Sequence, residues 1–107
     1  DEVPVEFKRS DLESKLQNRE ISVREFVKAL AGSEAYVRRF YEPFPSAKVV
    51  EFLFRHLLGR TPASQAEVRE INQMLVDQGL KATIEFIVSG NEYARYFGEN
   101  VVPYKRV

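Results

Sequence analysis

Few residues of this chain have side chains suited to catalysis. His56 is the single histidine, and the nearest charged residues on its expected helix are Glu51 and Arg55. General acid–base chemistry needs a positioned partner, whereas a histidine late in a helix more often interacts with exposed carbonyls or packs at an interface. Glu67 and Glu70 stand at helical spacing, yet paired-carboxylate hydrolysis also needs a cleft and one raised pKa. A solvated helix face is the favoured interpretation of that pair.

Motifs for cofactors and metals are also missing from the sequence. It contains no phosphate-binding glycine loop, zinc ligand set or nucleophile elbow. The lack of cysteine excludes disulfides, thiolate metal sites and thioether-linked cofactors. We therefore predict no catalytic, cofactor-binding or metal-binding residue, and we predict that the chain is not an enzyme.

Arginines and aromatic residues occur together, as in the run from Arg38 to Tyr41, and such mixtures suit phosphates, stacked bases or proteins. Sixteen basic residues balance sixteen acidic ones, so no long-range field gathers nucleic acid. Arginine and tyrosine are favoured at protein interfaces, where they combine contact area with directional hydrogen bonds. We therefore predict a protein interface rather than nucleic-acid binding. The residues chosen for it are Arg38, Arg39, Tyr41, Arg55, Arg60, Tyr93, Arg95 and Tyr104.

Length and composition suit one domain over residues 1–107. Apolar residues make up 44% of the 107 residues, enough for one core, and charged residues make up 30%. No apolar run approaches the roughly 20 residues that span a bilayer, so we expect no direct membrane insertion. The polar start and the end at Val107 lead us to expect a piece of a longer, multidomain polypeptide.

Local signals place several helix ends. Serine followed three residues later by glutamate predicts a helix start, since each side chain satisfies a free amide there. Ser33 and Ser46 are further candidate caps, and Gly32, Gly59, Gly79 and Gly98 are candidate helix ends. The four serine–glutamate pairs are Ser10/Glu13, Ser22/Glu25, Ser64/Glu67 and Ser89/Glu92.

Apolar spacing supplies the helices between these signals. Apolar residues recur at three- and four-residue steps in segments such as 23–31 and 80–88, and residues 49–58 are apolar around most of the helix. No stretch shows sustained alternation, and hairpin signals are absent. The fold class is therefore predicted as all-α, a single compact bundle of about six or seven short helices, with 49–58 as the central helix and an extended C-terminal tail.

Three blocks together resemble the phycobilisome linker polypeptide domain. They are residues 20–30 (EISVREFVKAL), 54–62 (FRHLLGRTP) and 92–104, which includes FGENVVPY. Within that family, residues 49–56 (VVEFLFRH) and 93–97 (YARYF) are most similar to a repeat of the large core-membrane linker. The resemblance extends from about Leu12 to Arg106.

The resemblance implies a non-catalytic α-helical scaffold module that joins ring-shaped phycobiliprotein trimers and hexamers into the phycobilisome antenna and tunes nearby bilins. It implies phycobiliprotein partners, with allophycocyanin favoured over phycocyanin, and a location at the cytoplasmic or plastid stromal face of the thylakoid membrane. Because this chain has no cysteine, the covalent bilins are expected on partner phycobiliproteins or on another domain of the parent.

Two features depart from rod linkers, many of which are basic. This chain is charge-balanced, and residues 79–84 (GLKATI) lack the tyrosine and acidic residues common there in rod linkers. Two other classes of function stay open from the residues alone. They are a helical nucleic-acid-binding domain and a bacterial surface-associated helical module, since segments similar to 57–62 also occur in the latter.

Overall fold

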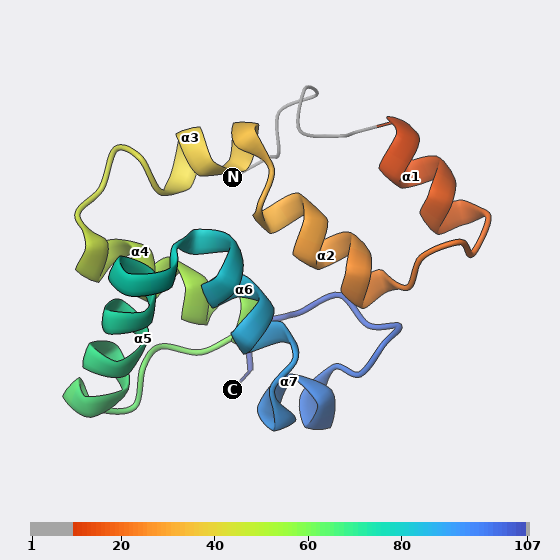
Figure 1. The fold of residues 1–107 in the computed structure, drawn as a ribbon. Coiled ribbons are helices and arrows are strands. Elements are labelled where there is room, and N and C mark those ends of the chain that lie inside the picture. The colour runs from red at the N-terminus through yellow and green to blue at the C-terminus, as the bar shows by residue number, and fades with distance from the viewer. Residues whose placement is uncertain (1–9, 107) are drawn as a thin grey trace.

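The structure is a computed structural model that describes residues 10–106, with side chains from Leu12 onward. Over these residues the chain forms seven α-helices, one π-helical turn and no strand, so the all-α prediction is confirmed (Figure 1). Residues 101–106 form neither helix nor strand, as the predicted tail requires. The elements are α1 (Ser10–Gln17), α2 (Val23–Ala31), α3 (Glu34–Phe40), α4 (Ser46–Leu53), η2 (Phe54–Leu58), α5 (Gln65–Gln78), α6 (Leu80–Val88) and α7 (Asn91–Tyr96).

The predicted central helix is confirmed as α4 continued by η2. Val50, Leu53, Phe54 and Leu57 are almost completely buried there, because apolar side chains surround this segment. The helix packs on α5, while η2 contacts both α6 and α7, and α6 also packs on α2. Helix α1 lies at the edge of the molecule, against α2 (Figure 1). One core therefore joins the described helices from α2 to α7.

The last turn of the central helix is a π-helix rather than an α-helix. Gly59 ends it in the left-handed conformation, with φ of +71°, and the Gly59 N–H donates to the carbonyls of Arg55 and Phe54. π-Turns are rare and occur often at functional positions, because the wider turn redirects the side chains that follow. Here the wider turn precedes Arg60.

Two of the four predicted serine–glutamate pairs cap helices. Ser22 and Glu25 form a complete capping box at α2, and the Ser64 hydroxyl accepts from the Glu67 N–H at α5. Ser89 instead ends α6 and donates to Glu85, so α7 begins after Gly90 and the prediction for Ser89/Glu92 is wrong. The side chain of Ser10 lies outside the described residues.

Two further caps were predicted from single serines. Ser33 caps α3, with its hydroxyl accepting from the Tyr36 N–H. Ser46 is not the cap of α4, because it is already the first helical residue and Pro45 occupies the cap position. The carbonyl of Pro45 accepts from the N–H groups of Lys48 and Val49.

Candidate functional site

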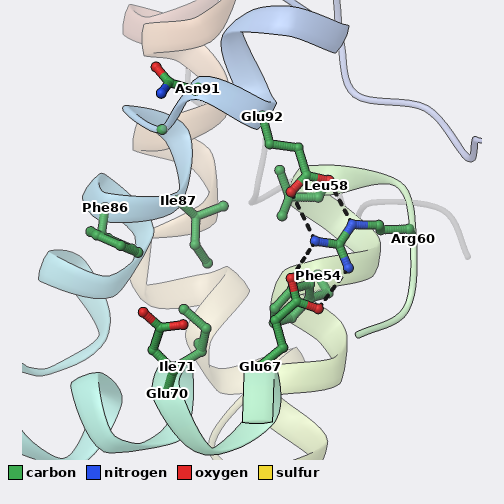
Figure 2. Close-up of a pocket in the computed structure, with 11 residues that line it drawn as sticks. Phe54, Leu58, Arg60, Glu67, Glu70, Ile71, Phe86, Ile87, Asn91 and Glu92 are labelled. Carbon is green, nitrogen blue, oxygen red and sulfur yellow. Dashed lines mark hydrogen bonds and ion pairs between the residues drawn. The ribbon is translucent and has the colours of Figure 1, made fainter. Parts of the chain in front are cut away.

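Arg60 holds the end of the central helix to two later helices. Its guanidinium donates to Glu67 at 3.0 and 2.7 Å and to Glu92 at 2.6 and 2.9 Å, as Figure 2 shows. A fifth bond, of 3.1 Å, reaches the carbonyl of Thr61. All five N–H donors of an arginine are thereby used. The group also lies over the Phe54 ring, 5.0 Å from its centre.

We call the side chains of Arg60, Glu67, Glu92 and Arg106 the Arg60 cluster. Its two carboxylates are held in their charged form. Hydrogen bonds from Arg60 and Arg106 lower the pKa of Glu92 to about 2. Hydrogen bonds from Arg60 and from the Ala63 N–H also lower the pKa of Glu67. The same contacts raise the pKa of Arg60. Two positive and two negative side chains are therefore locked together, which suits fixing the fold better than acid–base chemistry.

The C-terminal tail closes over this cluster. The Arg106 N–H donates to the carbonyl of Gly59 at 2.9 Å, and the Arg106 side chain donates to Glu92 at 2.5 Å. The Arg106 guanidinium also lies 3.8 Å from the centre of the Tyr96 ring. These contacts, together with Tyr104 edge-on to Phe97 at 5.1 Å, fix the tail against η2 and α7.

A surface pocket of about 210 Å³ opens beside the Arg60 cluster (Figure 2). Phe54, Leu58, Ile71 and Ile87 provide its apolar wall, and the half-exposed Phe86 stands at its edge. Acidic side chains of the cluster and the exposed Glu70 provide its polar rim. The pocket thus combines an apolar wall with a charged rim, a composition that suits contact with another molecule.

A second surface is aromatic and lies where α3 meets the central helix. We call the side chains of Tyr36, Phe40, Phe44, Phe52 and His56 the aromatic face. His56 stacks on Phe52 with ring centres 5.6 Å apart, and Phe44 meets Phe52 edge-on at 5.1 Å. Phe44 is 39% exposed. Such large, rigid side chains at the surface are typical of protein interfaces.

His56 lies within this face rather than in a catalytic arrangement. Its Nδ1 is 2.6 Å from the Tyr36 hydroxyl, and burial and the adjacent Arg55 lower its pKa. Burial raises the pKa of Tyr36 to about 12, so the phenol keeps its proton at neutral pH. Within the described part of the chain, the hydrogen-bond partner found for His56 is this phenol and not a carboxylate.

The structure separates the eight predicted interface residues into exposed and buried groups. Tyr41 and Tyr93 are 5% and 0% exposed, and both hydroxyls are buried without a hydrogen-bond partner. These two residues therefore belong to the hydrophobic core. Arg60 is committed to the internal cluster. The exposed members are Arg38, Arg39, Arg55, Arg95 and Tyr104.

Sequence reasoning missed the partners that make Arg60 structural. From the sequence, Glu67 is interpreted as a capping residue and as part of a solvated pair with Glu70, Glu92 only as a capping residue, and Arg106 is not selected at all. Glu92 is 32 residues from Arg60, so no local spacing reveals their contact. That Arg60 pairs with both Glu67 and Glu92 becomes visible only when the fold places α5 and α7 beside the end of η2.

Neither a metal site nor a membrane span occurs in the described residues. They contain no group of three acidic, histidine or cysteine side chains placed to hold a metal ion. None of their helices combines the length and apolar character needed to cross a membrane.

Comparison with known proteins identifies the family. The family model for the phycobilisome linker polypeptide matches residues 1–106. Similar curated proteins are named phycobiliprotein ApcE: one from Nostoc sp. (strain PCC 7120) is 60% identical over 98% of this chain, and one from Porphyra purpurea is 45% identical over 90%. The chain spans only 9% and 11% of these relatives. They confirm the resemblance to the core-membrane linker, which carries the name ApcE. The chain belongs to the phycobilisome linker polypeptide family.

Proposed function

We propose that this chain is a non-catalytic scaffold module that binds phycobiliprotein rings and joins them within the phycobilisome. The family match and the relatives named as phycobiliproteins support this role. Because this chain lacks cysteine, the bilins are carried by partner phycobiliproteins or by another domain of the parent. Allophycocyanin is the favoured partner, and the module acts at the cytoplasmic or stromal face of the thylakoid membrane.

The aromatic face carries this proposal. Its rings contact one another at centre distances of 4.6 to 6.0 Å, so a partner meets a surface that is already ordered. Two cations border it: the exposed Arg39 lies over Phe40, and the partly buried Lys48 lies over Phe52. Aromatic anchors with a cationic rim are the composition expected of an energetic interface centre.

The proposed contact residues follow from exposure. Arg39 and Arg55 border the aromatic face, and Arg38, Arg95 and Tyr104 are exposed on α3, on α7 and in the tail. Tyr41, Tyr93 and Arg60 support this surface through packing and the Arg60 cluster, without touching a partner.

Assembly with purified allophycocyanin trimers tests the proposal. Sedimentation velocity should show complexes larger than the free trimer, and emission should shift to the red. Phycocyanin trimers, run in parallel, should bind more weakly. A polypeptide with two copies of the module in tandem is measured as well, because linked copies bind with higher avidity than a single one. Unchanged sedimentation and spectra for both the single and the tandem chain would sink the proposal.

Charge reversal on the surface gives a matched comparison. R39E should weaken the complex, because Arg39 lies over Phe40 at the border of the aromatic face. R69E changes an exposed arginine of α5 and should leave the complex intact. Equal losses in the two variants would show attraction to the overall charge of the module rather than a defined interface.

A further inference from the structure

A second pocket, of about 430 Å³, lies between the end of η2 and the C-terminal tail. Four cationic side chains line it, those of Arg55, Arg60, Lys105 and Arg106, together with His56. None of the carboxylates in residues 10–106 lines this pocket. The chain as a whole is neutral, so four cations on one wall without an acid are a local excess of positive charge.

Internal ion pairs neutralise only half of this excess. Arg60 and Arg106 are balanced by Glu67 and Glu92, as the Arg60 cluster shows. Lys105 is exposed and forms no ion pair with the described residues. The wall therefore keeps at least the charge of Lys105 available to a ligand.

Arg55 is a second cation at this pocket, and its ion pair neutralises it only in part. Its side chain is 52% exposed, and its guanidinium lies 3.6 Å from Glu51, a distance longer than a well-formed charged hydrogen bond. Glu51 is shared, since Lys48 donates to it at 3.2 Å. One carboxylate thus serves two cations, and Arg55 can turn its planar fork toward the pocket with little loss.

His56 also lines this pocket, and a neutral imidazole offers one N–H donor. When the Tyr36 hydroxyl donates to Nδ1, the neutral ring carries its proton on Nε2. A ring whose pKa is lowered is neutral at pH 7, so this donor is present there. One guanidinium, one ammonium and one imidazole N–H at a single pocket form a donor set for one small anion.

We propose that this pocket binds a carboxylate, with Arg55 and Lys105 as the charged contacts and His56 as the neutral donor. The planar arginine fork matches the two oxygens of a carboxylate, and Lys105 adds a point charge. This deepens the proposed function and rests on it, because it names a contact that an acidic side chain of a partner would make. The site is formed by the chain alone, so it can be tested without any ring.

The test is a heteronuclear NMR titration of the 107-residue chain at constant ionic strength, with succinate as the probe and chloride as the reference. Saturable shifts are expected at the amides of Gly59, Thr61 and Lys105. The variant R55Q/K105Q should weaken succinate roughly tenfold, because two charge-assisted contacts are removed. R69Q/K81Q removes two exposed cations on α5 and α6 instead and should bind as the unmodified chain does.

A blocked aspartyl peptide in place of succinate separates the two sources of a carboxylate. Tighter binding of the peptide identifies a partner side chain as the ligand, whereas tighter binding of succinate identifies a free dicarboxylate. Shifts that never saturate, or that survive in R55Q/K105Q, would overturn the site. Loss of ring assembly with this titration intact would reject the proposed function and leave the pocket standing.

Discussion

Gly59 and Tyr104 are in backbone contact, 45 residues apart in the sequence. A Cβ added to Gly59 would lie 2.0 Å from the Tyr104 carbonyl oxygen, and Gly59 already has φ of +71°. Glycine is therefore required twice at this position, for its conformation and for the close approach of the tail. Gly59 thus both ends the central helix and allows the tail to pass close to it, immediately before Arg60.

G59A should release the tail and destabilise the fold. The left-handed conformation alone costs a non-glycine residue about 1–2 kcal/mol, and the clash with Tyr104 adds to it. Urea unfolding measures the loss, and the NMR signal of the Arg106 amide reports the tail. G98A is the matched control, because Gly98 has φ of +65° but a Cβ there meets nothing closer than 3.9 Å. An unchanged NMR signal of the Arg106 amide in G59A would contradict the close approach of the tail to Gly59.

R60Q should be among the most destabilising substitutions of a charged residue. It removes the guanidinium that satisfies Glu67 and Glu92, whose side chains are only about a third exposed. We expect a loss of about 1–3 kcal/mol in the free energy of unfolding, as for hydrogen bonds to charged groups. R38Q breaks an exposed pair and should cost at most about 0.5 kcal/mol. Similar unfolding midpoints for the two variants would show that the Arg60 cluster is not structural.

Acid should weaken the fold through Glu92. Its pKa in the folded chain is lowered from 4.5 to about 2, so its contribution is complete above pH 4.5 and is lost as the pH falls toward 2. Glu67 acts in the same direction. Stability measured by urea unfolding should fall across this window. E92Q should be less stable at neutral pH and show a shallower decline, and an unchanged slope would remove Glu92 from the explanation.

Much of the fold could be predicted because its signals are local. Apolar spacing predicts a helix over 80–88, and the structure has α6 at Leu80–Val88. Gly59, Gly79 and Gly98 were predicted as helix ends, and all three have positive φ. Each of these features depends on residues within one or two helical turns, which the sequence displays directly.

The candidate site was harder to predict because its contacts are distant or ambiguous. Ser89 cannot both end α6 and cap α7, since only Ser89 and Gly90 separate the two helices. Tyrosine is as common in cores as at interfaces, so residue type alone did not place Tyr41 and Tyr93 in the core. The π-turn at η2 leaves no pattern in sequence that differs from an ordinary apolar helix.

The pKa of His56 should lie below 6.5, its ordinary value, when followed by NMR of the ring protons. Burial is the larger cause and the charge of Arg55 the smaller. R55Q should therefore raise the pKa only part of the way back. R38Q, which changes an arginine of α3, should leave it where it was. A His56 pKa above 6.5 would mean that an acid faces the ring, and both this prediction and the carboxylate pocket would fail.

F44A should separate partner binding from stability. Phe44 is 39% exposed and its ring meets Phe52 edge-on, so its removal should cost about 1 kcal/mol of folding free energy. Binding to allophycocyanin trimers should weaken much more, because an interface anchor is fully desolvated only in the complex.

F86A is the matched control for F44A, since Phe86 is 51% exposed on α6 at the edge of the other pocket. Thermal unfolding and sedimentation of both variants give the comparison. If F86A weakens the complex and F44A does not, the partner docks at the pocket beside the Arg60 cluster instead of the aromatic face. Because both substitutions remove a partly exposed phenylalanine ring, such a reversal could not be attributed to general loss of stability.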